Sequence, residues 1–385
     1  MNELQELLTR GVANIIPNRE ELEKKLLLGE KLNIYLGIDP TAVNIHLGHA
    51  VILRKLQKFA EMGHNVTFLV GDFTAKIGDT SDKESERPQL TDSQIQENLK
   101  TYKSQAGKVI DFNKITIRFN SEWLSRLTFE ETIRLIGKFS LNDFISRELI
   151  KKRLTEGKSV GLLETIYPIM QGYDSYTLDT DIQLGGTDQT FNMQSGRKLL
   201  QDKKESFVMT MNFLSGTDGR KMSKTWGNAI WLTDSANEMF GKVMSISDDV
   251  IIEYFTLATD VPLSQVKEYE NEMITNPMEV KKKLAYEIVK NMYEDEADKA
   301  KENFEKTVQN REAPSEINEI DAASGALLLD FLDKNKLVES RSEAKRLIEQ
   351  GGVTIDGAPA AIGTVIDQTC IIKVGKRNFV KAKVN

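Results

Sequence analysis

Short apolar runs and helix-spaced apolar positions alternate along the first part of the chain. Ile34, Leu36 and Ile38 are apolar within the run from 32 to 38, which predicts a buried strand. Asp39-Pro40 ends this strand, and a helical pattern follows to about residue 62, with apolar positions at Ile45, Leu47, Val51, Ile52, Leu53 and Leu56. Residues 65–71 form a second apolar run. Strand, helix and strand in this order predict a βαβ unit with parallel strands and a right-handed crossover.

The same patterns continue to residue 211. We expect further strands at 115–119, 181–186 and 207–211, and helices at 91–111, 128–139, 141–155, 160–178 and 187–200. Residues 1–30 predict two helices, the first marked by Leu4, Leu7, Leu8 and Val12, the second capped by Asn18 and ended by Gly29. The polar segment 72–90 follows a strand and is expected to be a functional loop, because open α/β sheets bind ligands at that edge.

The remainder of the chain has a different pattern. Residues 235–307 are strongly charged and almost wholly helical in periodicity, and residues 310–315 are typical of a linker. Beyond them we expect helices at 324–334 and 341–350, then a strand at 353–355 and a hairpin turn at Asp356-Gly357. The sequence therefore predicts an α/β domain with a parallel sheet, an all-helical domain and a small α+β domain.

Composition narrows the class of protein. The 385 residues are 40% hydrophobic and 28% charged, which is ordinary for a globular chain of two or three domains. Cys370 is the single cysteine, so neither a disulfide framework nor a cysteine-based zinc site is expected. No run approaches the ~20 apolar residues of a membrane span, and residues 1–6 lack the pattern of a signal peptide. We therefore expect a cytoplasmic protein with no membrane partner.

The charge is unevenly distributed. Residues 334–385 contain ten Lys/Arg and five Asp/Glu, a net charge of +5, so the rest of the chain carries −12 of the total of −7. A basic C-terminal segment in an otherwise acidic chain predicts that this segment contacts a polyanion. On charge alone, a merely solvated basic surface explains the pattern equally well.

Two of the three histidines, His46 and His49, lie three residues apart where the first helix of the βαβ unit begins. Imidazoles at this spacing share one face of a first helical turn, beside backbone N–H groups that have no partner within the helix. Such a place suits a phosphate group. Taken alone, however, the pattern is more often two capping or surface histidines.

A basic loop, Gly219-Arg220-Lys221-Met222-Ser223-Lys224-Thr225, follows the strand expected at 207–211. H-L-G-H and K-M-S-K-T, in this order, resemble the two signatures of class I aminoacyl-tRNA synthetases, and the pair is far more specific than either half. The residues between them resemble the tyrosyl-tRNA synthetases of bacterial type, and the resemblance covers nearly the whole chain. It implies a Rossmann-like parallel-sheet catalytic domain at 1–232 with an inserted dimerisation segment at about 90–160, an all-helical domain on the anticodon side of tRNA at 233–318, and an S4-like RNA-binding domain at 319–385.

The resemblance also implies a reaction. Such an enzyme activates L-tyrosine with ATP to tyrosyl-adenylate and pyrophosphate, and then transfers tyrosine to the 3′ end of tRNA(Tyr). Mg²⁺ is expected to accompany ATP without a dedicated protein metal site. The residues implied to act on the phosphates are Thr41, His46, His49, Lys221 and Lys224. Those implied to bind the rest of ATP are Gly48, Asp188, Met222, Ser223 and Thr225.

A tyrosine pocket is the third implication. Tyr167, Gln171 and Asp174 are spaced so that they share one face of a helix. Three polar residues at this spacing usually form a solvated stripe. Their neighbours in the sequence are apolar, however, which predicts that the stripe is buried and hydrogen-bonded to a bound partner. The full set implied to bind tyrosine is Tyr35, Asp39, Asp79, Tyr167, Gln171, Asp174 and Gln189. Tyr35 and Asp174 are expected to hydrogen-bond the phenolic OH, which disfavours a synthetase for another amino acid, such as the related tryptophanyl enzymes. A non-enzymatic RNA-binding relative is the remaining alternative.

Two macromolecular contacts follow from the same resemblance. For the tRNA backbone we expect Lys345, Arg346, Lys373, Lys376 and Arg377. For a homodimer interface we expect the apolar face of Phe129, Ile133, Ile136 and Phe144, although a plain core face explains that pattern equally well.

Overall fold

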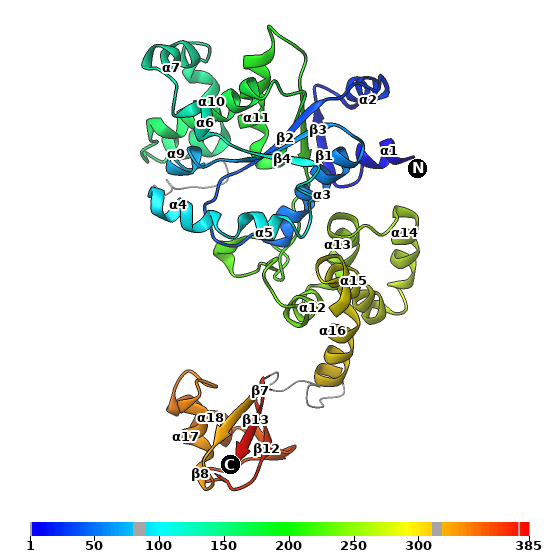
Figure 1. Cartoon of the computed structure of the whole chain (residues 1–385), viewed down its shortest axis with the longest axis vertical. Helices are drawn as coiled ribbons and strands as arrows, with labels where there is room; N and C mark the ends of the chain where they lie inside the picture. The colour runs from blue at the N-terminus through cyan, green and yellow to red at the C-terminus, as the bar shows by residue number, and fades with distance from the viewer. Residues whose placement is uncertain (1, 80–89, 310–317, 376–377, 385) are drawn as a thin grey trace. The chain divides into compact units, whose positions relative to one another are not determined.

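The computed structural model describes residues 2–79, 90–309, 318–375 and 378–384 (Figure 1). The chain divides into two compact units, residues 1–294 and 295–385, and each is described by itself. The linker expected at 310–315 and most of the loop expected at 72–90 lie outside the described residues. The three expected domain boundaries stay a prediction.

A six-stranded sheet is the centre of the first unit, with the strand order β1-β6-β5-β2-β3-β4. Neighbouring strands from β6 to β4 are parallel, whereas β1 is antiparallel to β6. The bounds are β1 Val12–Ile16, β2 Asn33–Ile38, β3 Asn65–Val70, β4 Ile115–Phe119, β5 Ile182–Gly186 and β6 Phe207–Met211. The five parallel strands confirm the predicted strand positions and the predicted α/β class.

Helices cover both faces of this sheet, with α3 on one side and α10 and α11 on the other (Figure 1). The helix α3 (Leu47–Glu61) connects β2 to β3 and buries Leu53, Leu56 and Phe59 completely. Each such side chain stabilises the fold by about 1.5–3 kcal/mol through its removal from water. The helices α10 (Leu162–Thr177) and α11 (Thr190–Leu200) pack against each other, and α11 also packs on β5 and β6.

The N-terminus corrects one expectation, because Val12 belongs to the strand β1 and not to a first helix. The helix α1 (Glu3–Leu7) ends early, and Gly11 with φ +67° turns the chain into β1. The second helix, α2 (Arg19–Leu27), is as predicted: the side chain of Asn18 accepts a hydrogen bond from the N–H of Glu21 at 2.9 Å. The strand β1, which the sequence pattern did not predict, is an antiparallel edge strand on an otherwise parallel sheet.

Between β4 and β5 the helices are shorter than the periodicity predicts. The segment 91–111 is two helices and the segment 141–155 is two more, because backbone breaks at Thr101 and at Arg147 interrupt them. Pro168 lies inside α10, which continues through it. The bounds are α4 Asp92–Leu99, α5 Tyr102–Ala106, α6 Ser121–Leu124, α7 Phe129–Ile136, α8 Leu141–Ile145 and α9 Glu148–Thr155.

The segment after the sheet is helical, as predicted. Within the first unit, α12 and α13 both pack on α15, and α13 also contacts α3 of the sheet layer. The bounds are α12 Ala236–Met244, α13 Ile251–Ala258, α14 Leu263–Glu272 and α15 Pro277–Met292.

The second unit begins with α16 (Ala297–Phe304) and contains a five-stranded sheet of order β10-β9-β12-β13-β7. Asp356 and Gly357 have φ +47° and +85°, and Ile355 pairs with Ala358, so the predicted hairpin is confirmed. The helix expected from residue 324 starts at 328, because Ala326–Leu327 pair with β11. The bounds are β7 Asn318–Ala322, β8 Ala326–Leu327, α17 Leu328–Lys334, α18 Arg341–Glu349, β9 Val353–Ile355, β10 Ala358–Pro359, β11 Val365–Ile366, β12 Cys370–Val374 and β13 Asn378–Val384.

Candidate active site

The site lies where the order of the strands reverses. From β2 the chain crosses through α3 to β3 on one side, and from β5 it crosses through α11 to β6 on the other. Open α/β sheets leave a crevice at the carboxyl ends of the two strands that flank such a switch point. Asp39 follows β2, and Asp188 and Gln189 lie in the short 3-10 helix η2 (Thr187–Gln189) that follows β5.

One cavity of about 550 Å³ opens at this edge. Every residue that the sequence predicts for tyrosine or ATP lines it. These residues are Tyr35, Asp39, Thr41, His46, Gly48, His49, Asp79, Tyr167, Gln171, Asp174, Asp188, Gln189, Lys221, Met222, Ser223, Lys224 and Thr225. The fold brings them together from segments almost two hundred residues apart. The H-L-G-H and K-M-S-K-T segments therefore line the same cavity.

The two histidines lie at the start of α3, with ring centroids 3.8 Å apart. The backbone N–H of His46 donates to Nδ1 of His49 at 3.3 Å, whereas Nδ1 of His46 is buried without a partner among the described residues. Burial first, and then the charge of Lys221, lower the pKa of His49 to about 4; burial and the neighbouring His49 lower the pKa of His46 to about 2. Both imidazoles are therefore neutral near pH 7 and can donate N–H to a phosphate oxygen.

A glycine between the histidines allows close packing. A Cβ atom at Gly48 would lie 3.0 Å from Nδ1 of His46 and 3.7 Å from Cβ of Met222. The helix start and the basic loop therefore approach each other at this position, and a larger residue would separate them.

The basic loop contacts both strand ends. Nζ of Lys224 donates to the backbone oxygen of Thr41 at 2.8 Å, and Nζ of Lys221 lies 3.2 Å from Oδ2 of Asp188 and 3.7 Å from the ring centre of Phe213. Asn228 holds the loop, because its Oδ1 accepts from the N–H of Ser223 at 2.8 Å. Two ammonium groups thus line the same cavity as the histidines, and the charge of Lys221 lowers the pKa of both imidazoles.

The deep end of the cavity is closed by Tyr35 and Asp174, which are both buried. Asp174 accepts hydrogen bonds from Nε1 of Trp123 at 2.7 Å and from Nδ2 of Asn120 at 3.1 Å. Burial nevertheless raises the pKa of Asp174 to about 8, since the two donors offset only part of the desolvation. The hydroxyl of Tyr35 lies 3.4 Å from Oε1 of Gln183.

Further polar side chains line the cavity between its deep end and the histidines. The hydroxyl of Tyr167 donates to Oδ2 of Asp39 at 2.9 Å, and Nε2 of Gln189 donates to Oδ2 of Asp79 at 2.7 Å. Oε1 of Gln171 is buried and has no hydrogen-bond partner among the described residues. A buried acceptor without a partner costs about 1–3 kcal/mol, so a ligand N–H is a fitting partner here. The stripe on α10 is thus buried, not solvated.

Several residues of the site were not predicted. Asn120 and Trp123, which hold Asp174, and Gln183, below Tyr35, lie in segments whose pattern is ordinary for a turn, a helix and a strand. Trp226 also lines the cavity and packs against the guanidinium of Arg220 at 4.6 Å. The only signal for them in the sequence is that they follow or belong to the strands that bear the site.

The residues expected to contact tRNA lie in the second unit. Lys345 and Arg346 are on α18, where their side chains are about 60% exposed, and Lys373 is on β12 with its ammonium 5.2 Å from the ring centre of Phe379. Lys376 and Arg377 lie outside the described residues. Whether these groups share one face for RNA stays a prediction.

Comparison with known proteins agrees with this geometry. A family model for class I tRNA synthetases (W and Y) matches residues 28–309, and a model of the S4 domain matches residues 328–366. The chain is 42% identical to a tyrosine–tRNA ligase of Thermotoga maritima, over 97% of this chain and 95% of the relative. It is 41% identical to a tyrosine–tRNA ligase of Dehalococcoides mccartyi, over 99% and 98%. The chain belongs to the class I tyrosyl-tRNA synthetases.

Solved structures share the fold of this synthetase. A tyrosyl-tRNA synthetase of Archaeoglobus fulgidus complexed with L-tyrosine is 21% identical with a TM-score of 0.61, and covers 78% of this chain and 98% of its own. A C-terminally truncated mitochondrial tyrosyl-tRNA synthetase of Coccidioides posadasii is 24% identical with a TM-score of 0.65, over 78% and 91%. The family match at residues 328–366 confirms the S4-like module, and the shared fold confirms the Rossmann-like sheet. In the described part of the synthetase no helix is long and apolar enough to cross a membrane.

Proposed function

We propose that this synthetase activates L-tyrosine in the cavity at the β2–β5 switch point and then transfers it to the 3′ end of tRNA(Tyr). In the first step a carboxylate oxygen of tyrosine attacks the α-phosphorus of ATP, and the bond to the β-phosphate bridging oxygen breaks to release pyrophosphate. In the second step a terminal ribose hydroxyl of the tRNA attacks the acyl carbon, and AMP leaves. The observation that carries the proposal is a single cavity with cationic groups at its mouth and a polar, buried deep end.

The mouth supplies electrostatic stabilisation. Negative charge builds on the leaving pyrophosphate, and we assign Lys221, Lys224, His46 and His49 as its donors, with Thr41 beside them. The neutral imidazoles are fixed by α3, whereas the lysines come from the loop that ends at the 3-10 helix Lys224–Trp226. No protein nucleophile is required, since alignment of the two substrates supplies the remaining catalysis.

The rest of ATP is assigned to the edge between α3 and η2. Gly48 leaves room for the adenine against the helix start, Asp188 is positioned to accept from ribose hydroxyls, and Met222, Ser223 and Thr225 line the same edge. We infer that Mg²⁺ enters with ATP, bound mainly by its phosphates. The described residues contain no group of three or more His, Cys, Asp or Glu arranged to hold a metal ion.

The deep end is assigned to the tyrosine side chain and the middle to its ammonium group. Asp79, Tyr167 and Gln171 surround the position for the ammonium, with Asp39 and Gln189 nearer the reacting carboxylate. We assign Tyr35 and Asp174, which both line the cavity, as hydrogen-bond partners of the phenolic OH. Phenylalanine would leave these two buried groups without that partner, at a cost of about 1–3 kcal/mol for each.

We further propose a homodimer that forms through α7. Phe129, Ile133 and Ile136 are 80%, 53% and 40% exposed on this helix, which is unusual for large apolar side chains that share one face. Phe144 does not belong to this surface: it is 4% exposed and packs edge-on against Phe191, so it is a core residue. Sedimentation of the wild type and of Phe129→Asp tests the interface, since only the variant should be monomeric. We infer a cytoplasmic location from the substrates.

Tyrosine-dependent exchange of labelled pyrophosphate into ATP is the decisive experiment for the first step. Exchange with tyrosine, and none with phenylalanine or tryptophan, supports the assignment of the deep end. Exchange with another amino acid instead would refute it, and no exchange with any amino acid would favour a non-enzymatic RNA-binding protein.

A further inference from the structure

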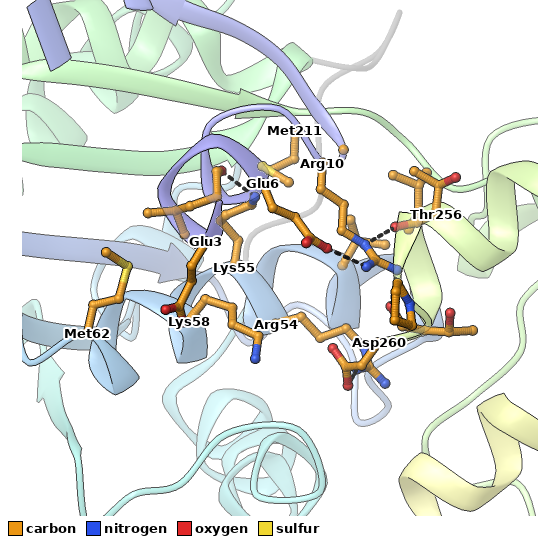
Figure 2. Close-up of a pocket in the computed structure, with 16 residues that line it drawn as sticks. Glu3, Glu6, Arg10, Arg54, Lys55, Lys58, Met62, Met211, Thr256 and Asp260 are labelled. Atoms are coloured by element: carbon orange, nitrogen blue, oxygen red, sulfur yellow. Dashed lines mark hydrogen bonds and ion pairs between the residues drawn. The ribbon is translucent and has the colours of Figure 1, made fainter. Parts of the chain in front are cut away.

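A second cavity, of about 400 Å³, lies apart from the catalytic one and shares no lining residue with it. It is bounded by α1, the middle and end of α3, the end of β6 and the segment around the end of α13 (Figure 2). Its volume is within the range of about 300–1,000 Å³ that is usual for small-molecule sites. Part of its wall is apolar, formed by Leu7, Val51, Met62, Met211, Leu257 and Pro262.

Four cationic side chains line this cavity, and three of them are paired with carboxylates. Arg10 lies 2.7 Å from Glu6, Arg54 lies 2.5 Å from Asp260, and Lys58 lies 2.9 Å from Glu61. Arg10 also donates to the backbone oxygen of Thr256 (Figure 2) and to those of Phe255 and Thr259, so four of its five N–H groups are used. Two of these pairs are local, within or directly after one helix, and the pair of Arg54 with Asp260 joins α3 to the segment that follows α13.

Lys55 is different, because it is only 7% exposed and makes no ion pair among the described residues. Its ammonium donates one hydrogen bond there, to the backbone oxygen of Leu7 at 2.6 Å, and has two further N–H groups. Burial, and secondarily the charge of Arg10, lower the pKa of Lys55 to about 8. The charge of Glu6 offsets part of this effect, but no carboxylate among the described residues makes a direct ion pair with Lys55. A buried cation without such a pair is costly, so an anion that binds its ammonium would be stabilised.

Arg54 supplies a second donor without a partner. Its Nε is buried and makes no hydrogen bond among the described residues, although its terminal nitrogen bonds Asp260. Arg54 and Lys55 are adjacent on α3 and both line the cavity. The cavity therefore combines an apolar wall with charged donors that have N–H groups to spare. Its four cations are balanced by four carboxylates, because Glu61, the partner of Lys58, adds to Glu3, Glu6 and Asp260 in the lining.

We propose that this cavity is a second binding site, which takes a small monocarboxylate with an apolar body, with the carboxylate on Lys55. The single ammonium without an ion pair among the described residues matches one carboxylate and not a phosphate dianion, and the apolar wall matches a hydrocarbon portion. Octanoate, below its micellar concentration, is a suitable probe, with 1-octanol and octylammonium as matched ligands that lack the negative charge.

The test is titration calorimetry of the full chain, with ligand-observed saturation-transfer NMR as a second readout. Octanoate should bind with one-to-one stoichiometry, also in the presence of saturating tyrosine, and about tenfold or more tighter than 1-octanol or octylammonium. Lys55→Met should weaken octanoate binding by about tenfold or more. Lys281→Met is the control, because Lys281 is also a buried lysine that donates to a backbone oxygen, that of Ile246, and lies outside the cavity; unlike Lys55, it also pairs with Asp248.

A second variant keeps the test decisive if Lys55→Met does not fold. Met62 lines the cavity at the end of α3 and is 37% exposed, so Met62→Trp should fold and fill part of the cavity while it retains Lys55. It should weaken octanoate binding as well. The proposal is overturned if octanoate shows no saturable binding, if 1-octanol binds equally well, or if the folded variants bind octanoate like the Lys281→Met control.

Discussion

Replacement of Asp174 by Asn should change how the stability of the synthetase depends on pH. Asp174 is 3% exposed, and burial raises its pKa from 3.8 to about 8 in the folded chain. Well below pH 3.8 the carboxyl is protonated in both the folded and the unfolded state, so its burial does not make stability depend on pH. As the pH rises towards 8, the unfolded state releases the proton while the folded state retains it, and stability is lost.

The size of this loss follows from the displacement of the pKa. From pH 5 to pH 8 the unfolded group is ionised and the folded group is not, and each pH unit is worth about 1.4 kcal/mol. The wild type should therefore lose roughly 4 kcal/mol between pH 5 and pH 9 that the Asp174→Asn variant does not lose. The substitution also changes the hydrogen bonds to Trp123 and Asn120, but that cost is the same at every pH and leaves the slope unaffected.

Urea unfolding at pH 5, 7 and 9, followed by tryptophan fluorescence, measures the difference between wild type and Asp174→Asn. Asp181→Asn is the matched control: bonds to Lys25, Asn33 and Lys204 lower the pKa of Asp181 despite partial burial. Its contribution is full above the unfolded pKa and constant from pH 5 to 9. If Asp174→Asn gives the same difference from wild type at pH 5 and pH 9, Asp174 is ionised throughout and the burial argument is wrong.

Three further predictions concern the reaction. His46→Ala and Lys221→Ala should each slow adenylate formation by about 10²–10³-fold in single-turnover experiments. Tyrosine affinity should change little, because the contacts of these residues strengthen only in the transition state. Unchanged rates would show that the two residues do not stabilise the charge on the leaving pyrophosphate. Asp174→Ala should severely lower kcat/KM for tyrosine in pyrophosphate exchange, and normal activation of tyrosine would mean that the pocket has been misplaced. Removal of the chain from Ile320 onward should preserve exchange, lower tRNA aminoacylation sharply and flatten the salt dependence of tRNA binding; equal aminoacylation and equal salt slopes would end the RNA-binding assignment.

The local pattern of apolar residues was sufficient to predict those strands and helices whose packing partners are close in the sequence. The strands β2 and β3 and the helix α3 between them each have a clear period, and the structure has them within one or two residues of the predicted bounds. The strand β1 was missed, because Val12–Ile16 is held by pairing with β6, almost two hundred residues away, as in Asn14 with Thr210. Nothing local in this segment distinguishes the end of a helix from an edge strand.

The residues of the site likewise divide into those that the sequence could predict and those that depend on contacts between distant segments. The two histidines could be singled out from their spacing at a helix start, and Asp39 and Asp188 followed from the family resemblance that the two signatures carry. Trp123 and Asn120 could not, because they act on Asp174 across a gap of about fifty positions in the chain. Their role follows from the burial of Asp174, a property that only the packed structure provides.

The ion pair of Lys221 with Asp188 connects the two halves of the ATP site in the ligand-free chain. Their atoms are 3.2 Å apart, and their side chains are 34% and 20% exposed, so the pair contributes at most about 1 kcal/mol. In the proposed roles these groups have different partners, the phosphates for Lys221 and the ribose hydroxyls for Asp188. ATP therefore replaces a weak internal contact with two separate ones, and the lysine moves toward the phosphates when the ribose takes its place. The loop itself stays anchored, because Asn228 accepts from the N–H of Ser223 and Lys224 donates to the backbone oxygen of Thr41. Only the side chain of Lys221 therefore has to move in this exchange of partners.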